Sequence, residues 1–362
     1  MELNPQQKQA VHHKGSPLLI VAGAGSGKTR TLTARLAHLL EEGVAPEHIV
    51  AITFTNKAAK EMRDRIANGK SQMANRNDSR PARSAGGSAI STSPYVGTFH
   101  SFGAKILREQ AHNLGRTPYY TIFDTDDSLA SIKSAMETVG LSKDRHPPAA
   151  LLGSISKIKS ELLEPADVLD PSEVEFFTAY EKFLERNNAF DFDDLIEKVV
   201  TLFTKYPAVL RNYQTRYTHI LVDEYQDVNT AQYRFVKFLA EAHRNLSVVG
   251  DDAQAIYGWR SADYRNFLNF EKDWTDARVV FLDQNYRSSG AIIGAASALI
   301  AHNKLQKPKR LWTENETGDL VHIIKANDPD EEAGWIVEAI HNSVISNSVI
   351  KKNAIIQLPI TL

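Results

Sequence analysis

The chain has 362 residues, of which 42% are hydrophobic and 24% charged, as in an ordinary globular protein of two or three domains. Its net charge of −2 gives no overall attraction to nucleic acid, so any basic surface must be local. The absence of cysteine excludes disulfides, cysteine-based zinc sites and iron–sulfur clusters. The sequence also lacks the features of a signal peptide and any apolar run of the ~20 residues that a membrane span needs. We therefore expect a cytoplasmic protein.

A phosphate-binding loop is predicted between an apolar strand at 18–21 and a helix with leucines at helical spacing. The loop residues are Ala22, Gly23, Ala24, Gly25, Ser26, Gly27, Lys28 and Thr29, with alanine in place of the first glycine of the strict pattern. The glycines let backbone N–H groups turn toward a triphosphate, and the start of the helix adds the positive end of its dipole. Lys28 would reach the β- and γ-phosphates, and the Thr29 hydroxyl would hold Mg²⁺. The loop therefore predicts binding of a nucleoside triphosphate.

Further along the chain, apolar strands alternate with helical patterns. Strands are expected at 50–54, 219–222, 246–249 and 279–282. This alternation predicts an α/β fold with a parallel sheet flanked by helices. Residues 112–195 are expected to be mostly helical, which makes them the best candidate for a separate inserted subdomain.

Residues 67–94 are polar and rich in glycine and serine, and their basic residues outnumber Asp78, the only acid in this segment. We interpret them as a flexible surface loop, and the alternative is an arm that touches nucleic acid.

Two consecutive carboxylates, Asp223 and Glu224, follow the apolar strand at 219–222. A phosphate loop and a later strand ending in Asp-Glu form the two halves of an NTPase site. Asp223 suits the Mg²⁺ shell opposite Thr29, because a hard cation prefers oxygen ligands. Glu224 suits the orientation and deprotonation of an attacking water, which favours hydrolysis over transfer to a substrate hydroxyl.

Several long segments of the chain resemble the UvrD/Rep/PcrA helicases of superfamily 1, in the right order and from residue 3 to about 340. The segments are 22–29, Thr53–Ala59, Gly97–Ser101, Asp191–Leu195, Asp223–Asp227, Val249–Arg260 and Gln284–Ser288. The resemblance implies two RecA-like domains that clamp ATP and move 3′ to 5′ along one DNA strand. It implies the first such domain at 1–111 and 196–281, the helical subdomain at 112–195, and the start of the second domain at 282–362.

The resemblance also assigns nucleotide contacts to matching positions. Gln7 corresponds to the glutamine that reads the adenine, and Arg35 and Tyr286 to the residues that sandwich the base. Gln254 and Arg287 correspond to groups that contact the γ-phosphate. A guanidinium at Arg287 is chemically suited to this, because it stabilises charge on the transferred phosphoryl group.

For DNA, the family stacks bases on aromatic side chains. The positions implied here are Phe54, Phe192, Tyr257 and Trp259, with Thr55, Asn56, His100 and Arg260 near the DNA backbone. Every base has a π-face, so aromatic platforms bind single strands without sequence preference. The alternative for Phe54 is a place in the core, whereas Trp259 lies between Gly258 and Arg260 in a polar segment.

The resemblance weakens after residue 290. Asp330–Val337 still looks like the family's acidic helix, and Asn353–Ile356 could be the next strand, but Leu358–Leu362 replaces the family's Arg-Thr-Asn. We therefore expect an incomplete second domain and an amino-terminal part of a helicase.

Three functions stay open at this stage. The preferred one is an ATP-dependent 3′–5′ DNA helicase or translocase that binds single-stranded DNA and its junctions with duplex. The alternatives are a remnant that binds ATP and single-stranded DNA without unwinding, and the motor of a RecB/AddA-type helicase–nuclease.

Overall fold

The computed structural model describes residues 2–74 and 93–345. The chain divides into two compact units. Within the described residues, the first unit comprises 2–22, 28–74 and 93–282, and the second comprises 23–27 and 283–345. Of the loop expected from sequence at 67–94, residues 75–92 lie outside the described residues, and residues 67–74 belong to the helix Asn56–Ala74 instead of a loop. The segment 353–362 also lies outside the described residues.

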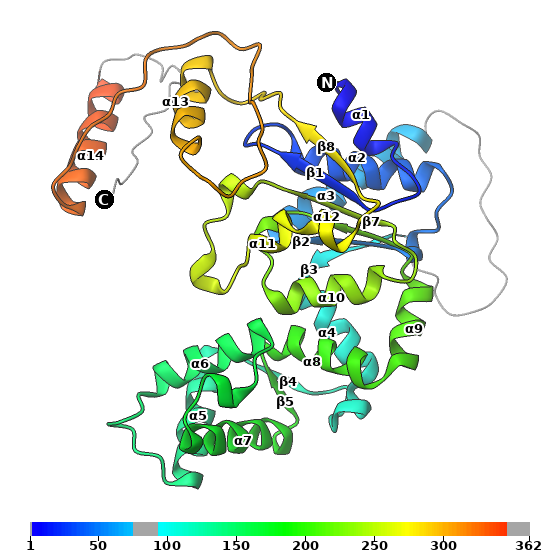
Figure 1. Ribbon diagram of the computed structural model, residues 1–362, viewed down its shortest axis with the longest axis vertical. Helices are drawn as coiled ribbons and strands as arrows, with labels where there is room; N and C mark the ends of the chain where they lie inside the picture. Colours follow the sequence, from blue (N-terminus) through cyan, green and yellow to red (C-terminus); the bar gives the residue numbers. More distant parts are fainter. Residues whose placement is uncertain (1, 75–92, 346–362) are drawn as a thin grey trace. The chain divides into compact units, whose positions relative to one another are not determined.

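The elements alternate along the chain as the sequence predicted (Figure 1). The strands are β1 (Leu18–Ala22), β2 (Ile49–Thr53), β3 (Tyr95–Thr98), β4 (Thr121–Phe123), β5 (Ala189–Asp191), β6 (His219–Val222), β7 (Leu246–Gly250) and β8 (Arg278–Leu282). The helices are α1 (Pro5–Val11), α2 (Lys28–Glu41), α3 (Asn56–Ala74), α4 (Phe99–Gln110), α5 (Thr125–Val139), α6 (Pro148–Glu161), α7 (Pro171–Arg186), α8 (Asp194–Lys205), α9 (Pro207–Arg216), α10 (Thr230–Ala240), α11 (Arg265–Leu268), α12 (Phe270–Asp273), α13 (Gly290–Ile300) and α14 (Pro329–Ile345).

The centre of the first unit is a six-stranded sheet with the order β3-β2-β6-β7-β1-β8. All its neighbouring strands pair in parallel. The carboxyl ends of parallel strands meet at one edge of a sheet, which is where such folds place their ligand-binding residues. The predicted parallel α/β fold is therefore confirmed.

Helices cover both faces of this sheet, because the strand side chains alternate between two separate apolar cores. On one face, Leu18 and Ile20 of β1 pack with residues of α1, α2 and α3. On the other face, Leu19 and Val21 pack with residues of α4, α8 and α10. Figure 1 shows these two helical layers on opposite sides of the strands.

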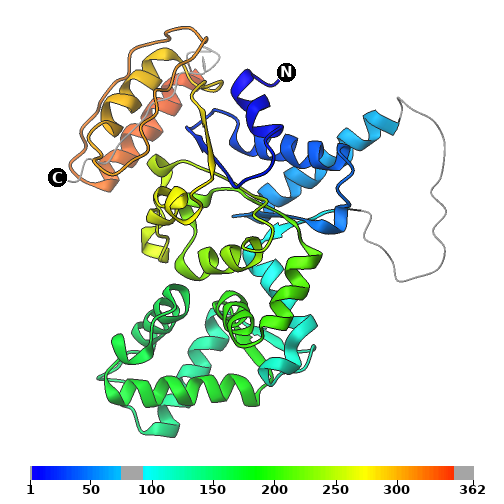
Figure 2. The ribbon, with the colours of Figure 1, turned by 45° about the vertical axis from the view of Figure 1, so that its right-hand side comes forward.

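Helices α5, α6 and α7 have a third core of their own, which includes Ile132, Ile155 and Tyr180. Figure 2 shows the ribbon of these helices in green and blue-green, below the strands. Asp124 and Asp170 cap α5 and α7 through their side chains, which satisfies the first backbone N–H groups of each helix. The segment is mostly helical as expected, but it also contains β4 and β5, a parallel pair that the sequence analysis did not predict. Three-residue strands carry too little periodicity to be recognised.

In the second unit, α13 and α14 are the two helices of the described residues, and α14 covers the acidic helix expected at 330–337. Across residues 2–74 and 93–345, no helix is both long and apolar enough to span a bilayer.

Candidate functional site

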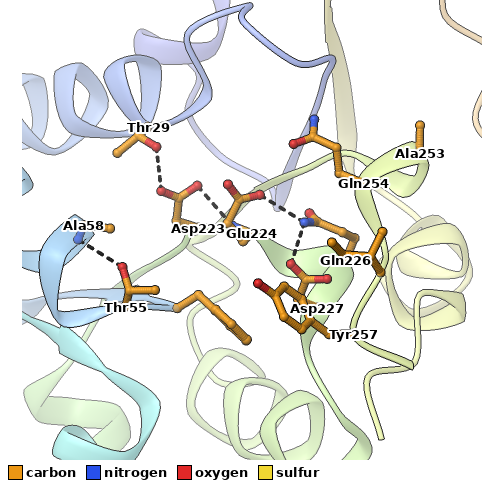
Figure 3. Close-up of a pocket in the computed structure, with 12 residues that line it drawn as sticks. Thr29, Thr55, Ala58, Asp223, Glu224, Gln226, Asp227, Ala253, Gln254 and Tyr257 are labelled. Carbon is orange, nitrogen blue, oxygen red and sulfur yellow. Dashed lines mark hydrogen bonds between the residues drawn. The ribbon is translucent and has the colours of Figure 1, made fainter. Parts of the chain in front are cut away.

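The ends of β6 and β7 and the start of α2 bring together five of the predicted site residues in the first unit. Figure 3 shows four of them, Thr29, Asp223, Glu224 and Gln254. The Thr29 hydroxyl donates a hydrogen bond to Asp223 Oδ2 at 2.9 Å. Lys28 Nζ lies 3.1 Å from Glu224 Oε2 and donates to Gln254 Oε1 at 3.0 Å. Residues that are 194 and 226 positions apart in the sequence thus form one polar cluster.

The electrostatics of this cluster suit a cation. Burial and the neighbouring Glu224 carboxylate raise the pKa of Asp223 to about 6. The raised pKa means that the ionised form of Asp223 is unfavourable in this buried position. A hard divalent cation bound by the carboxylate and by the hydroxyl 2.9 Å away would stabilise that ionised form. The oxygen donors present therefore fit the Mg²⁺ expected from the sequence.

The backbone of Glu224 is held in an unusual conformation, with φ of 50° in the left-handed region. Its N–H donates to its neighbour's carboxylate, Asp223 Oδ1, at 3.0 Å. A non-glycine residue in this region stores strain, which is frequent at functional sites. The two adjacent carboxylates lie in different environments, as their different predicted roles require, since Asp223 is buried and the Glu224 side chain is 31% exposed.

A cavity of about 450 Å³ opens beside this cluster. It is lined by Thr29, Phe54, Thr55, Ala58, Asp223, Glu224, Gln226, Asp227, Ala253, Gln254, Ile256 and Tyr257. Burial, followed by the charge of Glu224, raises the pKa of Asp227 to about 6. The lining thus contains both predicted nucleotide-site residues, such as Thr29, Asp223 and Gln254, and the predicted DNA-binding residues Phe54, Thr55 and Tyr257.

The predicted DNA-stacking aromatics form two groups. In the first, the ring centroids of Phe54 and Tyr257 lie 5.2 Å apart, and those of Tyr257 and Trp259 lie 6.4 Å apart. Phe54 is half-buried and is not part of the cores of the sheet, and the Trp259 side chain is 73% exposed. Three rings in a row with an exposed end can stack on unpaired bases.

In the second group, His100 stacks on Phe192 with 3.9 Å between ring centroids. Phe192 is 54% exposed, whereas burial lowers the pKa of His100 to about 4, so that its imidazole is neutral near pH 7. A neutral, flat imidazole supports the phenyl ring without adding charge.

A buried ion cluster supports the turn that carries Phe192. The N–H of Asp191 donates to Asp194 Oδ2 and the N–H of Asp194 donates to Asp191 Oδ1, at 3.1 and 2.8 Å. Lys159 Nζ lies 2.6 Å from Asp191, 2.7 Å from Asp194 and 2.7 Å from Glu181. Burial opposes the charge of Lys159, but the three carboxylates outweigh burial and raise its pKa. Sequence analysis missed Lys159 and Glu181, because nothing local distinguishes them from surface residues on α6 and α7.

The phosphate-loop residues 23–27 are described within the second unit. Gly25 and Gly27 have φ of 68° and 86°, a region that favours glycine. Asn285 donates to the carbonyl of Ala24 at 2.6 Å, and the N–H of Tyr286 donates to the carbonyl of Gly25 at 3.0 Å. A Cβ at Gly25 would lie 2.7 Å from Asn285 Nδ2, so this glycine is needed for both its conformation and its contact.

Two predicted base-contacting residues of the first unit are buried and hydrogen-bonded. Gln7 Oε1 accepts from the N–H of Asn4 at 3.1 Å in a capping box at the start of α1. The Arg35 guanidinium donates to Ser247 Oγ and to the carbonyls of Ala10, Val11 and His13. Contact of Gln7 and Arg35 with a base stays a prediction.

The remaining predicted residues lie at element ends or in loops. In the second unit, Tyr286 and Arg287 are exposed, and Tyr286 donates to Gln284 at 2.8 Å. In the first unit, Asn56 is exposed at the start of α3, and the Thr55 hydroxyl accepts from the N–H of Ala58. Arg260 lies in the 3₁₀ turn Gly258–Arg260, and its side chain is outside what the structure describes.

The sheet, the strand-end carboxylates and the glycine loop define a P-loop protein with a RecA-like α/β fold. A family described as the UvrD/REP helicase N-terminal domain matches residues 3–275, and the UvrD-like helicase C-terminal domain matches residues 280–357. The chain belongs to the UvrD/Rep/PcrA helicase family.

Curated relatives agree with this assignment. The ATP-dependent DNA helicase PcrA of Leuconostoc citreum is 42% identical over 346 residues, which cover 93% of this chain and 44% of that protein. The protein of the same name from Staphylococcus aureus strain Mu50 is also 42% identical, over 93% of this chain and 45% of its own length. The chain thus spans less than half the length of these relatives.

Proposed function

We propose that this chain hydrolyses ATP in a DNA-stimulated reaction and uses it to move 3′ to 5′ along single-stranded DNA, as the motor of a helicase. The observation that carries the proposal is the cavity beside Asp223. Its wall holds Thr29, Glu224 and Gln254 together with the aromatic rings of Phe54 and Tyr257. A motor needs such closeness, because a change at the triphosphate must alter the grip on DNA. The curated relatives are named ATP-dependent DNA helicases, which supports the helicase part of the proposal.

Each residue of the cluster has a distinct part in the proposed hydrolysis. Thr29 and Asp223 would hold Mg²⁺, which would neutralise charge on the phosphates. Lys28 exchanges its contact with Glu224 for the phosphates, which frees the carboxylate to orient and deprotonate the attacking water. Gln254 contacts the γ-phosphate. Arg287 stabilises charge on the transferred group, a role that rests on the family resemblance.

We also propose the division expected from the sequence. Residues 1–111 and 196–281 form the first RecA-like domain, 112–195 a helical subdomain, and 282–362 the start of a second RecA-like domain. The separate core of α5, α6 and α7 supports the helical subdomain at 112–195. The rings of Phe54, Tyr257 and Trp259, and the Phe192–His100 pair, form the DNA track.

The substitution Glu224→Gln tests the proposed chemistry. It should lower the ATP turnover of the DNA-bound chain by roughly 10²–10⁴-fold, the usual contribution of a general base, while leaving nucleotide affinity within a few fold. Turnover is measured with and without a single-stranded oligonucleotide, and Glu241→Gln, at an exposed glutamate, is the matched control. Equal turnover in the Glu224→Gln variant and the unchanged chain would refute the assignment.

Polarity and unwinding need their own measurement. Partial duplexes with a 3′ or a 5′ single-stranded tail are offered to the chain with ATP and Mg²⁺. Displacement from the 3′-tailed duplex alone supports the proposal, and displacement from the 5′-tailed one contradicts it. Binding of both ATP and single-stranded DNA with no turnover would favour an ATP- and DNA-binding protein that does not unwind.

A further inference from the structure

Gln226 follows the two candidate catalytic carboxylates and has no role in the function proposed above. Its side chain is 1% exposed and lies at the wall of the cavity. Its amide nitrogen donates to Glu224 Oε2 at 3.0 Å and to Asp227 Oδ2 at 2.9 Å (Figure 3). Its Oε1 accepts from the backbone N–H of Asp251 at 3.0 Å. Gln226 therefore joins the segment after β6 to the segment after β7.

These contacts close a ring of hydrogen bonds around the cluster. From Glu224 the ring continues through Lys28 Nζ to Gln254 Oε1, at 3.1 and 3.0 Å. Gln254 Nε2 donates to Asp251 Oδ2, and the N–H of Asp251 returns to Gln226. Three of these residues are candidate catalytic groups, and Gln226 closes the circuit between them.

The ring continues into the loop that carries the DNA-contacting aromatics. Residues 251–263, here named the aromatic loop, contain Tyr257 and Trp259. Gln226 binds the first residue of the loop, Asp251, through its backbone N–H. The N–H of the last residue, Asp263, donates to the carbonyl of Val228 at 3.1 Å. Both ends of the aromatic loop are therefore attached to residues 226–228, directly after Glu224.

The chemistry of the amide explains why a glutamine stands at this position. Turning the amide around would point its carbonyl at two carboxylates and its NH₂ at a backbone N–H, so a single orientation satisfies all its partners. Asp227 Oδ1 is buried without a hydrogen-bond partner in the described part of the chain, and Gln226 is the donor to the other oxygen of that carboxylate, Oδ2. A Cβ at position 250 would lie 2.6 Å from Gln226 Oε1, so the end of β7 has room for the Gln226 side chain only because residue 250 is glycine.

We propose that Gln226 is a positioning residue that couples occupancy of the triphosphate site to the conformation of the aromatic loop. The inference rests on the proposed function. A triphosphate that takes Lys28 and Gln254 breaks one half of the ring, and the hydrogen bonds of Gln226 still link the Glu224 carboxylate to the backbone of Asp251. A displacement of Glu224 is thus transmitted to the backbone at the start of the aromatic loop, and from there to the rings that grip DNA.

Coupling of this kind is measured as a linkage between two binding equilibria. The affinity of the full chain for a fluorescein-labelled oligothymidylate is determined with and without a saturating non-hydrolysable ATP analogue and Mg²⁺. The ratio of the two affinities is the coupling factor, for which we expect about tenfold, within the usual range of roughly 5–150-fold. No turnover is needed for this measurement.

Two variants break the circuit in different ways. Gln226→Leu removes all three hydrogen bonds, and the isosteric Gln226→Glu keeps an acceptor for Asp251 but repels Glu224 and Asp227. Both should reduce the coupling factor to near one, with each ligand's own affinity within about threefold of the unchanged chain. Gln232→Glu is the matched control. Gln232 is a buried capping glutamine on α10, where glutamate serves the same cap, so its coupling factor should not change.

The outcomes separate this inference from the proposed function. If the chain binds neither the analogue nor the oligonucleotide, the proposed function fails and the inference fails with it. If both ligands bind but the unchanged chain shows no coupling, or the Gln226 variants keep it, the proposed function stands and the inference is overturned. Should Gln226→Leu fail to fold by thermal melting, the isosteric Gln226→Glu decides.

Discussion

Replacement of Lys159 by methionine should be among the most destabilising single changes in the first unit. The ammonium of Lys159 is 2% exposed and lies within 2.7 Å of carboxylate oxygens of Asp191, Asp194 and Glu181. Methionine fills a similar volume, so the loss is electrostatic rather than a cavity. Removing one partner of a buried ion pair costs about 3–5 kcal/mol, because the remaining charge stays buried.

The neighbouring Lys198 limits the size of this effect. Its Nζ lies 2.6 Å from Glu181 and 3.5 Å from Asp194, so these two carboxylates keep one cation. In the variant, Asp191 would keep the hydrogen bond from the Tyr180 hydroxyl at 3.0 Å, but Lys159 is the only cation with which it forms an ion pair in the described part of the chain. We therefore expect a loss of about 3 kcal/mol, the lower end of the range, against a total stability of about 5–15 kcal/mol.

The assay is urea unfolding of the full chain followed by circular dichroism. Lys105→Met, which removes a partly exposed pair with Glu109 on α4, is the matched control and should cost less than about 1 kcal/mol. The cost of Lys159→Met should also shrink in an Asp191→Asn background, because one buried charge is then absent. If Lys159→Met costs no more than Lys105→Met, the buried cluster does not stabilise the fold as reasoned here.

Two further predictions concern helix packing and pH. Gly103→Ala should destabilise the first unit by about 2 kcal/mol or more, because its Cβ would fall 1.9 Å from the carbonyl oxygen of Leu195 on α8. Gly153 on α6 is the control: a Cβ there would have no neighbour within 4 Å, so Gly153→Ala should stabilise the unit by up to about 1 kcal/mol. Thermal melting measures both changes, and a Gly103→Ala variant that melts above Gly153→Ala would refute the prediction. Burial lowers the pKa of His100 to about 4, so the unfolded chain binds a proton at higher pH than the folded chain does, and stability should fall as the pH drops from about 6.5 to 4. His100→Asn should remove up to about 3 kcal/mol of that loss in urea unfolding at the two pH values, and an unchanged slope would contradict the assignment.

Much of the fold was predictable because its signals are local. Five mainly apolar runs of four or five residues, alternating with helical patterns, were sufficient to predict a parallel α/β sheet, and all five correspond to strands of that sheet. The same local patterns identified the glycine loop at 22–29 and the carboxylates Asp223 and Glu224. The short strands β3, β4 and β5 escaped prediction. Gly97 interrupts the apolar residues of β3, and the three residues of β4 or β5 cannot display a period.

The sequence by itself determined which chemical groups are available: a glycine loop with Lys28 and Thr29, two adjacent carboxylates, and aromatic residues near Tyr257. Only the tertiary structure decided which of them meet. The hydrogen bonds from the Thr29 hydroxyl to Asp223 and from the N–H of Asp251 to Gln226 join segments that follow different strands, and the order of strands that brings those segments together is a property of the whole sheet. The burial of Lys159 is likewise invisible in α6 alone. A buried charge is defined by its surroundings, and long-range packing supplies them.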